Sequence, residues 1–443
     1  MKQETLEKFA GETGNNFKQT EIGLIPEDWE VVRLGEVAKV VRGVSWKKTE
    51  ANKEGKGIPV LTIPNVEKGK INFEFNYFLT KSVSRQKLLN LKDIIFVASS
   101  GSIENVGRNA ILKYLPFERI AFASFLSVLR AETNKIVPEF LYFLINSRWI
   151  DFTKFVKRAA DGKYNFQLRD FERNALIPLP PLPEQRKIVR VLDKIQQAIE
   201  IQDRIIEQAK RLKKSLMQKL FTEGLYGEEQ KETEIGLIPK SWEVVRLGEV
   251  FEVQQGKQLS RKRKIKKGEI ECKFLRTSNV FWEGIKLQNL DTMFVSKKEL
   301  DRLKVRKGDI FVCEGGDVGR TAILEEDIDF DLIFQNHLHR LRPKSGDIYP
   351  KFFVYWMEKH IKLDRIHVPA NVTTIPNLSA SRLKSFFLPL PSFEEQKQIT
   401  HILSTIDRKI EVEQKRKQVL KELFKTMLHK LMSGEIRLKE VEI

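Results

Sequence analysis

Residues 20–37 read TEIGLIPEDWEVVRLGEV, and residues 233–250 read TEIGLIPKSWEVVRLGEV. Sixteen of these eighteen positions match, and the two segments lie 213 positions apart. A second pair follows 211 positions apart, IPLPPLPEQRKI at 177–188 and LPLPSFEEQKQI at 388–399. A repeat of this length is the size of a domain. The chain is therefore expected to hold two similar units related by pseudo-two-fold symmetry, a symmetry element that duplex DNA also has.

The composition favours a polyanionic partner. The chain has 443 residues, with 78 Lys and Arg against 60 Asp and Glu, a formal net charge of +18. Such a charge favours binding to nucleic acid or to an anionic membrane surface over an inert basic surface. Charged residues break the apolar runs well before the ~18 residues that a membrane span needs. With a polar, acidic start and only Cys272 and Cys313, the chain is predicted to be reduced and cytoplasmic, without disulfides or a cysteine-rich zinc module.

Each repeat opens with a proline followed by a short alternating apolar run. Pro26 and Pro239 precede these runs, a pattern that predicts a turn leading into a strand or a short helix. Trp29 and Trp242 stand in the same segments and are candidates for stacking on bases. Because both lie in the most closely matched part of the repeat, packing is the preferred interpretation.

The middle of each repeat, at 38–180 and 251–391, predicts a mixed α/β domain with an irregular sheet. Strand-like runs at 93–97 and 309–312 alternate with glycine-rich turns, and helical spacing occurs at 137–158 and 349–363. Elsewhere the two middles hardly match: VSWKKTEAN at 44–52 faces QLSRKRKIK at 258–266. A shared framework with different interiors predicts two copies of one fold, each with its own recognition surface.

Each repeat closes with a long helix, predicted at 183–224 and 393–434. Proline before the helix, acidic residues in its first turn and a glycine at its end are the expected boundary signals. Apolar residues alternate at spacings of four and three, the pattern of a coiled-coil seam. Two helices of equal length and register favour an antiparallel coiled coil with each other over solvated helices packed on their own domains. The predicted pairing residues are Ile188, Leu192, Ile195, Ile199, Ile206, Leu216, Leu220, Ile399, Leu403, Ile406, Ile410, Leu420, Phe424, Met427 and Leu431.

Polar residues interrupt this seam at Gln202 and Lys213 in the first helix and at Glu413 and Lys417 in the second. Polar seam residues cost stability but fix register and pairing. A helix of ~38 residues spans about 57 Å. Such a rod is predicted to hold two DNA readers one to two helical turns of duplex apart.

The sequence contains binding features but no recognisable catalytic centre. It lacks a Gly-x-x-x-x-Gly-Lys-[Ser/Thr] phosphate loop and a Gly-x-Gly-x-x-Gly after a strand. It also lacks an Asn-Pro-Pro-aromatic tetrapeptide and a Pro-Asp…Glu-x-Lys nuclease pattern. The segment EGGDVG at 314–319 predicts a turn. His337 and His339 are placed on one face of a predicted strand, where a structural or base-contacting role is favoured over a metal site.

Basic and polar clusters are the candidate DNA contacts. Basic loops neutralise phosphates, and side chains among them contact base edges. The densest run is RKRKIKK at 261–267, and a second candidate loop precedes the proline-rich stretch in each copy. A solvated loop explains any single cluster about as well. The candidate residues are Arg42, Lys47, Lys48, Ser99, Ser100, Lys163, Tyr164, Asn165, Lys257, Arg261, Lys262, Arg263, Lys264, Asn371, Thr373 and Thr374.

The ordered set of motifs, present twice, resembles the specificity subunits of type I restriction-modification systems. The matching features are Gly-Leu-Ile-Pro-x-x-Trp-Glu-Val-Val-Arg-Leu-Gly-Glu at 23–36 and 236–249, and the proline-rich stretches at 176–188 and 387–399 that end in Glu-Gln-x-x-Ile. The likeness covers nearly the whole chain except about the first 19 residues. The dense basic run in the second copy suggests that its domain binds DNA phosphates more strongly than the first domain does.

The resemblance implies two target recognition domains, at 20–182 and 233–392, each binding one half of a bipartite, asymmetric DNA site. It implies that the helices set the spacer and dock two modification subunits. Those partners would carry S-adenosylmethionine, and restriction subunits would carry ATP and Mg, so this chain would bind no cofactor. An extension at 1–19, a linker at 225–232 and a tail at 435–443 complete the predicted organisation.

Two other classes of function stay open at this point. One is a self-contained restriction or modification enzyme with an unrecognised active site. The other is a coiled-coil scaffold that binds nucleic acid, RNA included, without sequence preference.

Overall fold

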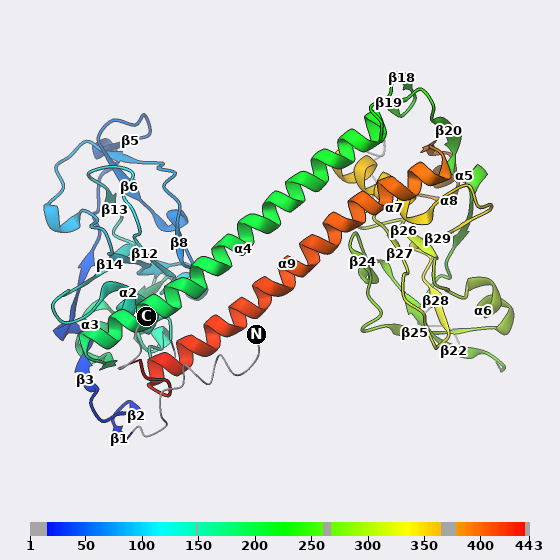
Figure 1. The fold of residues 1–443 in the computed structure, drawn as a ribbon. Helices are drawn as coiled ribbons and strands as arrows, with labels where there is room; N and C mark the ends of the chain where they lie inside the picture. Colours follow the sequence, from blue (N-terminus) through cyan, green and yellow to red (C-terminus); the bar gives the residue numbers. More distant parts are fainter. Residues whose placement is uncertain (1–15, 148, 260–266, 365–377, 439–443) are drawn as a thin grey trace. The chain divides into compact units, whose positions relative to one another are not determined.

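The computed structural model describes residues 16–147, 149–259, 267–364 and 378–438. The chain divides into two compact units, unit 1 with Met1–Ile201 and Arg416–Ile443, and unit 2 with Gln202–Lys415 (Figure 1). Each unit joins an α/β domain to halves of two long helices, α4 (Leu182–Glu223) and α9 (Phe393–Ser433). The mixed α/β class is confirmed, and both helices end within one residue of their predicted bounds. The predicted domain boundaries stay a prediction, since the compact units divide each helix.

The opening and closing segments of each repeat pair with each other. In unit 1, hairpin β1–β2 (Phe17–Thr20 and Gly23–Pro26) leads to β3 (Glu30–Arg33), which pairs antiparallel with β17 (Leu176–Leu179). The apolar run therefore forms the strand that the sequence allowed. Unit 2 repeats the arrangement with β18 (Gln230–Thr233), β19 (Gly236–Pro239), β20 (Glu243–Arg246) and β30 (Phe387–Leu390).

Trp29 and Trp242 are packing residues. Both side chains have no exposed surface. Their indole nitrogens donate to Glu184 (3.1 Å) and Glu395 (3.0 Å), at the N-termini of α4 and α9, where a carboxylate is favourable. The packing interpretation is therefore confirmed, and the Glu of the repeated Glu-Gln motif is explained.

The main sheet has the same strand order in both units and is antiparallel. The order is β12-β10-β14-β4 in unit 1 and β27-β26-β29-β21 in unit 2. β10 and β26 confirm the strands predicted at 93–97 and 309–312. The strand bounds are β4 Ala38–Arg42, β10 Ile94–Val97, β12 Asn109–Ile111, β14 Leu126–Ala131, β21 Phe251–Gln255, β26 Ile310–Cys313, β27 Thr321–Ile323 and β29 Leu338–Pro343.

Short strands and helices complete each domain. Unit 1 adds β5 Ala51–Asn52, β6 Ile58–Leu61, β7 Val66–Glu67, β8 Lys70–Ile71, β9 Phe78–Leu79, β11 Ser99–Ser100, β13 Ala121–Phe122, β15 Val156–Arg158, β16 Tyr164–Phe166, α2 Pro138–Ile145 and α3 Leu168–Asn174. Unit 2 adds β22 Ile270–Leu275, β23 Val280–Phe281, β24 Gly284–Ile285, β25 Asp291–Val295, β28 Leu332–Phe334, α5 Leu247–Val250, α6 Lys297–Leu303, α7 Pro350–Met357 and α8 Ala380–Lys384.

One predicted helix is about a third as long as expected. The helical spacing at 137–158 forms a helix only in α2, and a 3-10 turn at Phe152–Phe155 and strand β15 follow. Phe152 and Phe155 pack on Phe166, with ring centroids 5.5 and 6.2 Å apart, so their apolar spacing reflects core packing of a turn. The helical prediction at 349–363 is confirmed by α7 and the π-helical turn Glu358–Leu363.

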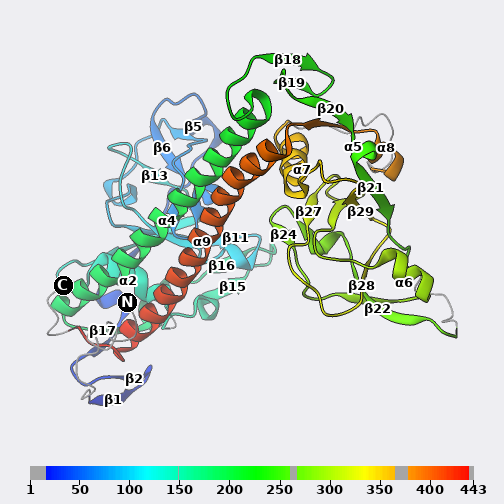
Figure 2. The same cartoon turned by 45° about the vertical axis from the view of Figure 1, so that its right-hand side comes forward.

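Helices α4 and α9 lie side by side and antiparallel in each unit (Figures 1 and 2). In unit 1 the start of α4 shares a core with the end of α9, through Leu192 and Leu431. In unit 2 the end of α4 shares a core with the start of α9, through Leu220 and Leu403. All fifteen predicted pairing residues are buried or half-buried. The same clusters include domain residues, so the helix ends pack on the domains as well as on each other.

Polar contacts cross the helix seam in unit 2. Gln202 donates a hydrogen bond to the buried Glu413. The ammonium of Lys213 lies 2.7 Å from Glu358 and 2.8 Å from Asp407, which also accepts a 2.7 Å hydrogen bond from Tyr355. Burial acts to lower the pKa of Lys213, but the two carboxylates outweigh it and the pKa is raised. At the matching positions of unit 1 the rings of Phe143 and Phe424 pack 6.0 Å apart.

A left-handed glycine ends each long helix against the opening hairpin. Gly224 (φ 69°) contacts Pro239 and Gly434 (φ 73°) contacts Pro26, where a Cβ atom would lie 2.2 Å from the proline ring. Such close approach requires glycine. Beyond Gly434, Arg437 binds both Glu184 and Asp28. Within the described residues, no helix has an apolar stretch long enough to cross a bilayer.

Candidate nucleic-acid interface

One edge of the unit 1 main sheet carries several predicted site residues. Strands β4 and β10 run in the same direction, because both pair antiparallel with β14. Arg42 at the end of β4 and Ser99 just after β10 therefore lie toward the same edge. Gly43 follows Arg42, and a Cβ atom there would lie 2.1 Å from the Ala123 carbonyl oxygen. Gly256 holds the matching place in unit 2 for the same reason, since a Cβ atom there would lie 2.3 Å from the Gln335 carbonyl oxygen.

Strand pairing brings together residues that lie more than sixty positions apart. β11 pairs with β16, with Ser99 opposite Asn165 and Ser100 opposite Tyr164. The second candidate loop of the first copy, which holds Lys163, Tyr164 and Asn165, is therefore wrongly predicted as a loop, because Tyr164–Phe166 is a strand. Phe166 is buried and its amide donates to the Ala98 carbonyl, which fixes this segment in the sheet.

The third strand of this sheet, β15, adds two basic residues that the sequence interpretation missed. Lys157 lies opposite Asn165 and Arg158 opposite Tyr164, and both side chains are exposed. The Arg158 guanidinium lies 5.8 Å from the centre of the Tyr164 ring. The sequence FVKR at 155–158 has no alternating pattern that would have marked this strand, and the range 137–158 was predicted as one helix.

The other predicted basic residues of unit 1 are exposed, and they differ in whether a carboxylate pairs with them. Lys163 forms a 3.1 Å ion pair with Asp161 at the surface. Lys47 and Lys48 are exposed on the segment after β4, at a 3-10 turn whose Glu50 accepts from the Lys47 amide. Exposed cations of this kind suit phosphate contacts.

The matching edge of unit 2 has different chemistry. Gln255 ends β21 where Arg42 ends β4, and its amide nitrogen donates to the Glu314 carboxylate (3.0 Å). His339 in β29 matches Ser127, is fully buried, and lies 2.8 Å from the Leu378 carbonyl oxygen. Burial lowers the pKa of His339, so the ring is neutral. His337 is exposed and precedes the strand, so the two histidines do not share one environment.

Lys257 is neutralised within its own domain. Its ammonium lies 2.7 Å from Glu299, and its side chain is 16% exposed. The hydrogen bond from Lys257 lowers the pKa of Glu299 to about 2. The predicted residues Arg261, Lys262, Arg263, Lys264, Asn371, Thr373 and Thr374 lie outside the described residues.

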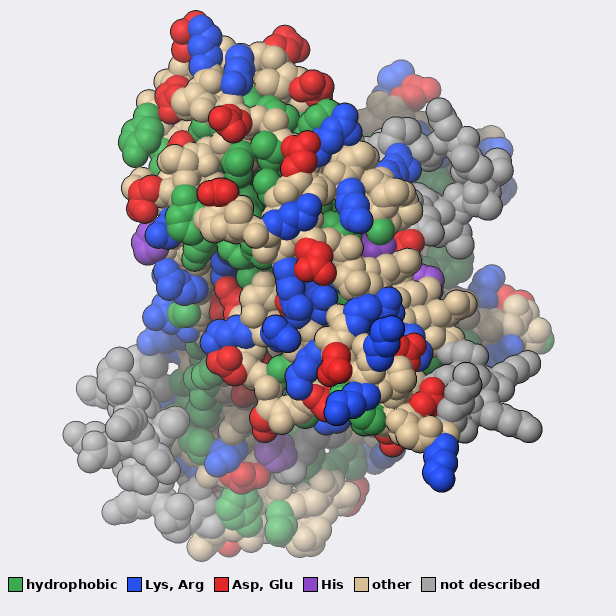
Figure 3. Space-filling view, turned by 90° about the vertical axis from the view of Figure 1, so that its right-hand side faces the viewer, with side chains coloured by type: hydrophobic (Ala, Val, Ile, Leu, Met, Phe, Trp, Pro, Cys, Tyr) green, Lys and Arg blue, Asp and Glu red, His purple; other side chains and the backbone are tan. Residues whose placement is uncertain are grey.

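The surface of unit 2 is rich in cations on one face. Figure 3, which looks at this unit, shows Lys and Arg side chains gathered over the middle of the visible face, with fewer Asp and Glu among them. Among the residues that the structure describes, no three or more His, Cys, Asp or Glu side chains form a group suited to a metal ion. The glycine-rich segment at 314–319 is a turn, as predicted.

Two copies of one α/β domain, with different polar side chains at the same sheet edge and long antiparallel helices between their motifs, define a duplicated nucleic-acid recognition protein. The family model described as type I restriction modification DNA specificity domain matches twice, at residues 26–211 and 239–422. The chain belongs to this family. It is the DNA sequence-specificity subunit of a type I restriction-modification system, which works with DNA and with separate methyltransferase and restriction subunits.

Relatives and solved structures agree with this assignment. The putative type I restriction enzyme MjaX specificity subunit of Methanocaldococcus jannaschii is 30% identical over 437 residues, covering 96% of this chain and 97% of that protein. A chain from a structural study of type I R-M complex assembly has a TM-score of 0.58 at 19% identity, covering 93% of this chain and 99% of that chain. The type I S subunit from M. genitalium has a TM-score of 0.54 at 17% identity, covering 95% and 98%. These two likenesses show the shared fold. Neither alternative function, a self-contained enzyme or a non-specific scaffold, is supported.

Proposed function

We propose that each domain binds one half of a bipartite, asymmetric DNA site. The observation that carries this proposal is the difference at matched positions of one sheet edge. The exposed Arg42 in unit 1 is replaced by the exposed Gln255 in unit 2, and the buried residues paired with them, Ser127 and His339, differ as well. An exposed Arg donates to guanine, whereas an amide side chain suits adenine, so unlike edges favour unlike half-sites.

The β11–β16–β15 sheet is the proposed reading surface of unit 1. Its exposed and half-exposed side chains alternate between the two faces, with the amide of Asn165 and Lys157 on one and the ring of Tyr164 and Arg158 on the other. Amides read base edges, and cations neutralise phosphates. In this proposal Ser99 supports Asn165 from the neighbouring strand.

The double variant Tyr164→Ala, Asn165→Ala is expected to relax base preference in one half-site only. Loss of a base contact costs roughly 1–3 kcal/mol, or about ten- to hundredfold in affinity. Competition binding of the chain with its modification subunit, on duplexes altered in either half, measures this. Tyr114→Ala, which removes an exposed tyrosine elsewhere on unit 1, is the matched control. Equal weakening of both halves would contradict the assignment.

The paired helices are proposed to set the spacer between half-sites and to dock two modification subunits. Support comes from the continuity of α4 and α9, each of which begins in one unit and ends in the other. S-adenosylmethionine, ATP and Mg are proposed to bind the partner subunits, and the complex to act in the cytoplasm. The absence of a phosphate-loop motif in the sequence supports this division of labour.

Inserting seven residues into both helices beside the Gln202–Glu413 contact is expected to lengthen the preferred spacer. Seven helical residues add about 10 Å, which matches about 3 base pairs of duplex. Methylation of substrates with graded spacers measures the change. An insertion of the same length at 225–232, between α4 and the second opening hairpin, should leave the spacer as it was. A spacer unchanged by the helix insertions refutes the ruler model.

A further inference from the structure

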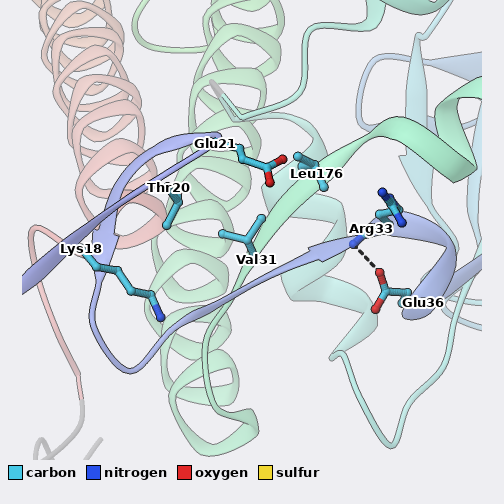
Figure 4. Close-up of a pocket in the computed structure, with 7 residues that line it drawn as sticks. All are labelled: Lys18, Thr20, Glu21, Val31, Arg33, Glu36 and Leu176. Atoms are coloured by element: carbon cyan, nitrogen blue, oxygen red, sulfur yellow. Dashed lines mark hydrogen bonds between the residues drawn. The ribbon is translucent and has the colours of Figure 1, made fainter.

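Side chains that distinguish two half-sites must differ between the two units. The pocket beside the opening hairpin of unit 1 does not meet this requirement (Figure 4). Six of the seven residues that line it are identical in unit 2, and only Leu176 is replaced, by Phe387. The sheet edge meets the requirement, because the exposed side chains of Arg42 and Gln255 occupy the same place in the two units. The hydrogen bonds around Gln255 determine what this edge can recognise.

The amide group of Gln255 is held in one orientation by its neighbours. Its Nε2 donates to the Glu314 carboxylate at 3.0 Å and to the backbone carbonyl oxygen of Asn336 at 3.2 Å. Both partners are acceptors only, so a reversed amide would set its own oxygen against two other oxygens. The N–H groups of the amide are therefore used within unit 2. Among the residues that the structure describes, no donor binds the remaining atom, Oε1.

Glu314 is an unfavourable residue to bury at this edge. It is 6% exposed, and within the described part of the chain no cation forms an ion pair with it. A buried carboxylate without a cation is destabilising. The fold does not require it, because Ala98 holds the matching position. The amides of Ala98 and Glu314 donate to the matching carbonyl oxygens of Phe125 and His337. A buried charge that the fold does not need, bonded to an exposed amide, indicates a functional role.

The two units present opposite hydrogen-bonding groups at this one position. The Arg42 guanidinium has donors only. No carboxylate pairs with it among the described residues. Gln255, whose donors are used, offers one acceptor. In the major groove, guanine and thymine present the acceptors O6 and O4, whereas adenine and cytosine present the amino groups N6 and N4. A residue with donors only suits the first two bases, and a residue with an acceptor only suits the other two.

Resting on the proposed function, we infer that Gln255 and Glu314 select adenine or cytosine at one position of the unit 2 half-site. Gln255 accepts a hydrogen bond from the amino group of the base. Glu314 is a positioning residue that denies the amide its reversed orientation. A free amide could turn over and donate to a keto oxygen. The held amide excludes guanine and thymine, because their keto oxygens would face Oε1.

Glu314→Ala, which copies Ala98, tests the positioning role. The full-length chain with its modification subunit is equilibrated with a pool of random duplexes, and the bound sequences are counted. The wild-type chain is expected to prefer an amino base over a keto base by roughly ten- to hundredfold at one position of one half-site. The variant frees an N–H of Gln255, so this preference should fall about tenfold or more at that position alone. Loss of a negative charge strengthens binding to every sequence, so the readout is the ratio between bases.

Gln255→Arg, which copies Arg42, is expected to invert the preference at the same position. A keto base should then be favoured over an amino base by about tenfold or more. Gln255 is exposed, so thermal unfolding should stay unchanged. Gln254→Ala is the matched control. Neighbouring side chains of a strand point to opposite faces, so this change should leave every base preference as it is.

Two outcomes would overturn the inference and leave the proposed function intact. In the first, the wild-type chain selects two half-sites but Gln255→Arg alters no base preference. In the second, Glu314→Ala weakens binding equally for all four bases, as a purely structural role predicts. If the wild-type chain selects no half-site at all, the proposed function fails together with this inference.

Discussion

Arg437→Ala is expected to destabilise unit 1 by about 3–5 kcal/mol, the usual cost of removing one partner from a buried ion pair. The Arg437 side chain is 8% exposed and binds Glu184 at 2.7 and 2.8 Å and Asp28 at 2.9 Å. Glu184 is 3% exposed. Without Arg437, this buried carboxylate would keep only neutral donors, among them the Trp29 indole.

Urea unfolding followed by fluorescence of the buried tryptophans measures the loss. Two transitions are expected, since two-state behaviour is not assured for two units, and only one should move. Tyr226→Ala changes the matching position of unit 2, where the side chain is 73% exposed, and should alter stability by about 0.5 kcal/mol or less. A loss below about 1 kcal/mol in Arg437→Ala would show that the tail does not hold the hairpin.

Lys213→Ala is expected to destabilise unit 2 by a similar amount, about 3–5 kcal/mol. Lys213 is 14% exposed and Glu358 is 10% exposed, so removal of the ammonium leaves Asp407 without this ion pair and Glu358 with only the half-exposed Lys362, 3.3 Å away. Burial raises the pKa of Tyr355, which therefore stays a neutral donor to Asp407 and cannot replace the lost charge. Lys214→Ala, an exposed neighbour on α4, is the control and should have little effect.

The matching positions of unit 1 suggest substitutions that would restore the stability lost in Lys213→Ala. Its matching positions hold Phe424 for Lys213, Phe143 for Tyr355, Gln196 for Asp407 and Asn146 for Glu358. Transplanting this set as Lys213→Phe, Tyr355→Phe, Asp407→Gln and Glu358→Asn is expected to restore most of the stability, because apolar packing often replaces a buried ion pair without loss. The same unfolding curves decide this. A transplant as unstable as Lys213→Ala would mean that the surrounding core of unit 2 cannot accept the rings.

The internal repeat allowed the framework to be predicted from sequence. The two repeated segments of the first copy, 20–37 and 177–188, are hydrogen-bonded neighbours through β3 and β17. The heptad spacing located both long helices. Periodicity works there because one face of each element is buried along its whole length. It failed at 146–158, where aromatic residues of a turn reproduce helical spacing.

The candidate site was harder to predict, since long-range strand pairing creates it. Nothing in the local sequence places Ser99 beside Asn165 or Arg158 beside Tyr164. The local sequence likewise offered no reason for the two positions at which the opening repeats differ. Asp28 differs from Ser241 because only unit 1 has Arg437 to bind, and Lys240 instead forms a 2.6 Å ion pair with Glu229. Both explanations depend on residues distant in the chain or outside the repeat.

The hydrogen bond between Gln202 and Glu413 joins two residues at the same position of the repeat. If two copies of α9 from different chains were to pair, Glu413 would face another Glu413, and two carboxylates in a dry seam repel each other. Two copies of α4 would place Gln202 against Gln202 with no anion to bind. Each helix is therefore complemented only by the other kind, which its own chain provides. Pairing of two like helices from different chains is therefore disfavoured, whereas α4 and α9 complement each other through this contact.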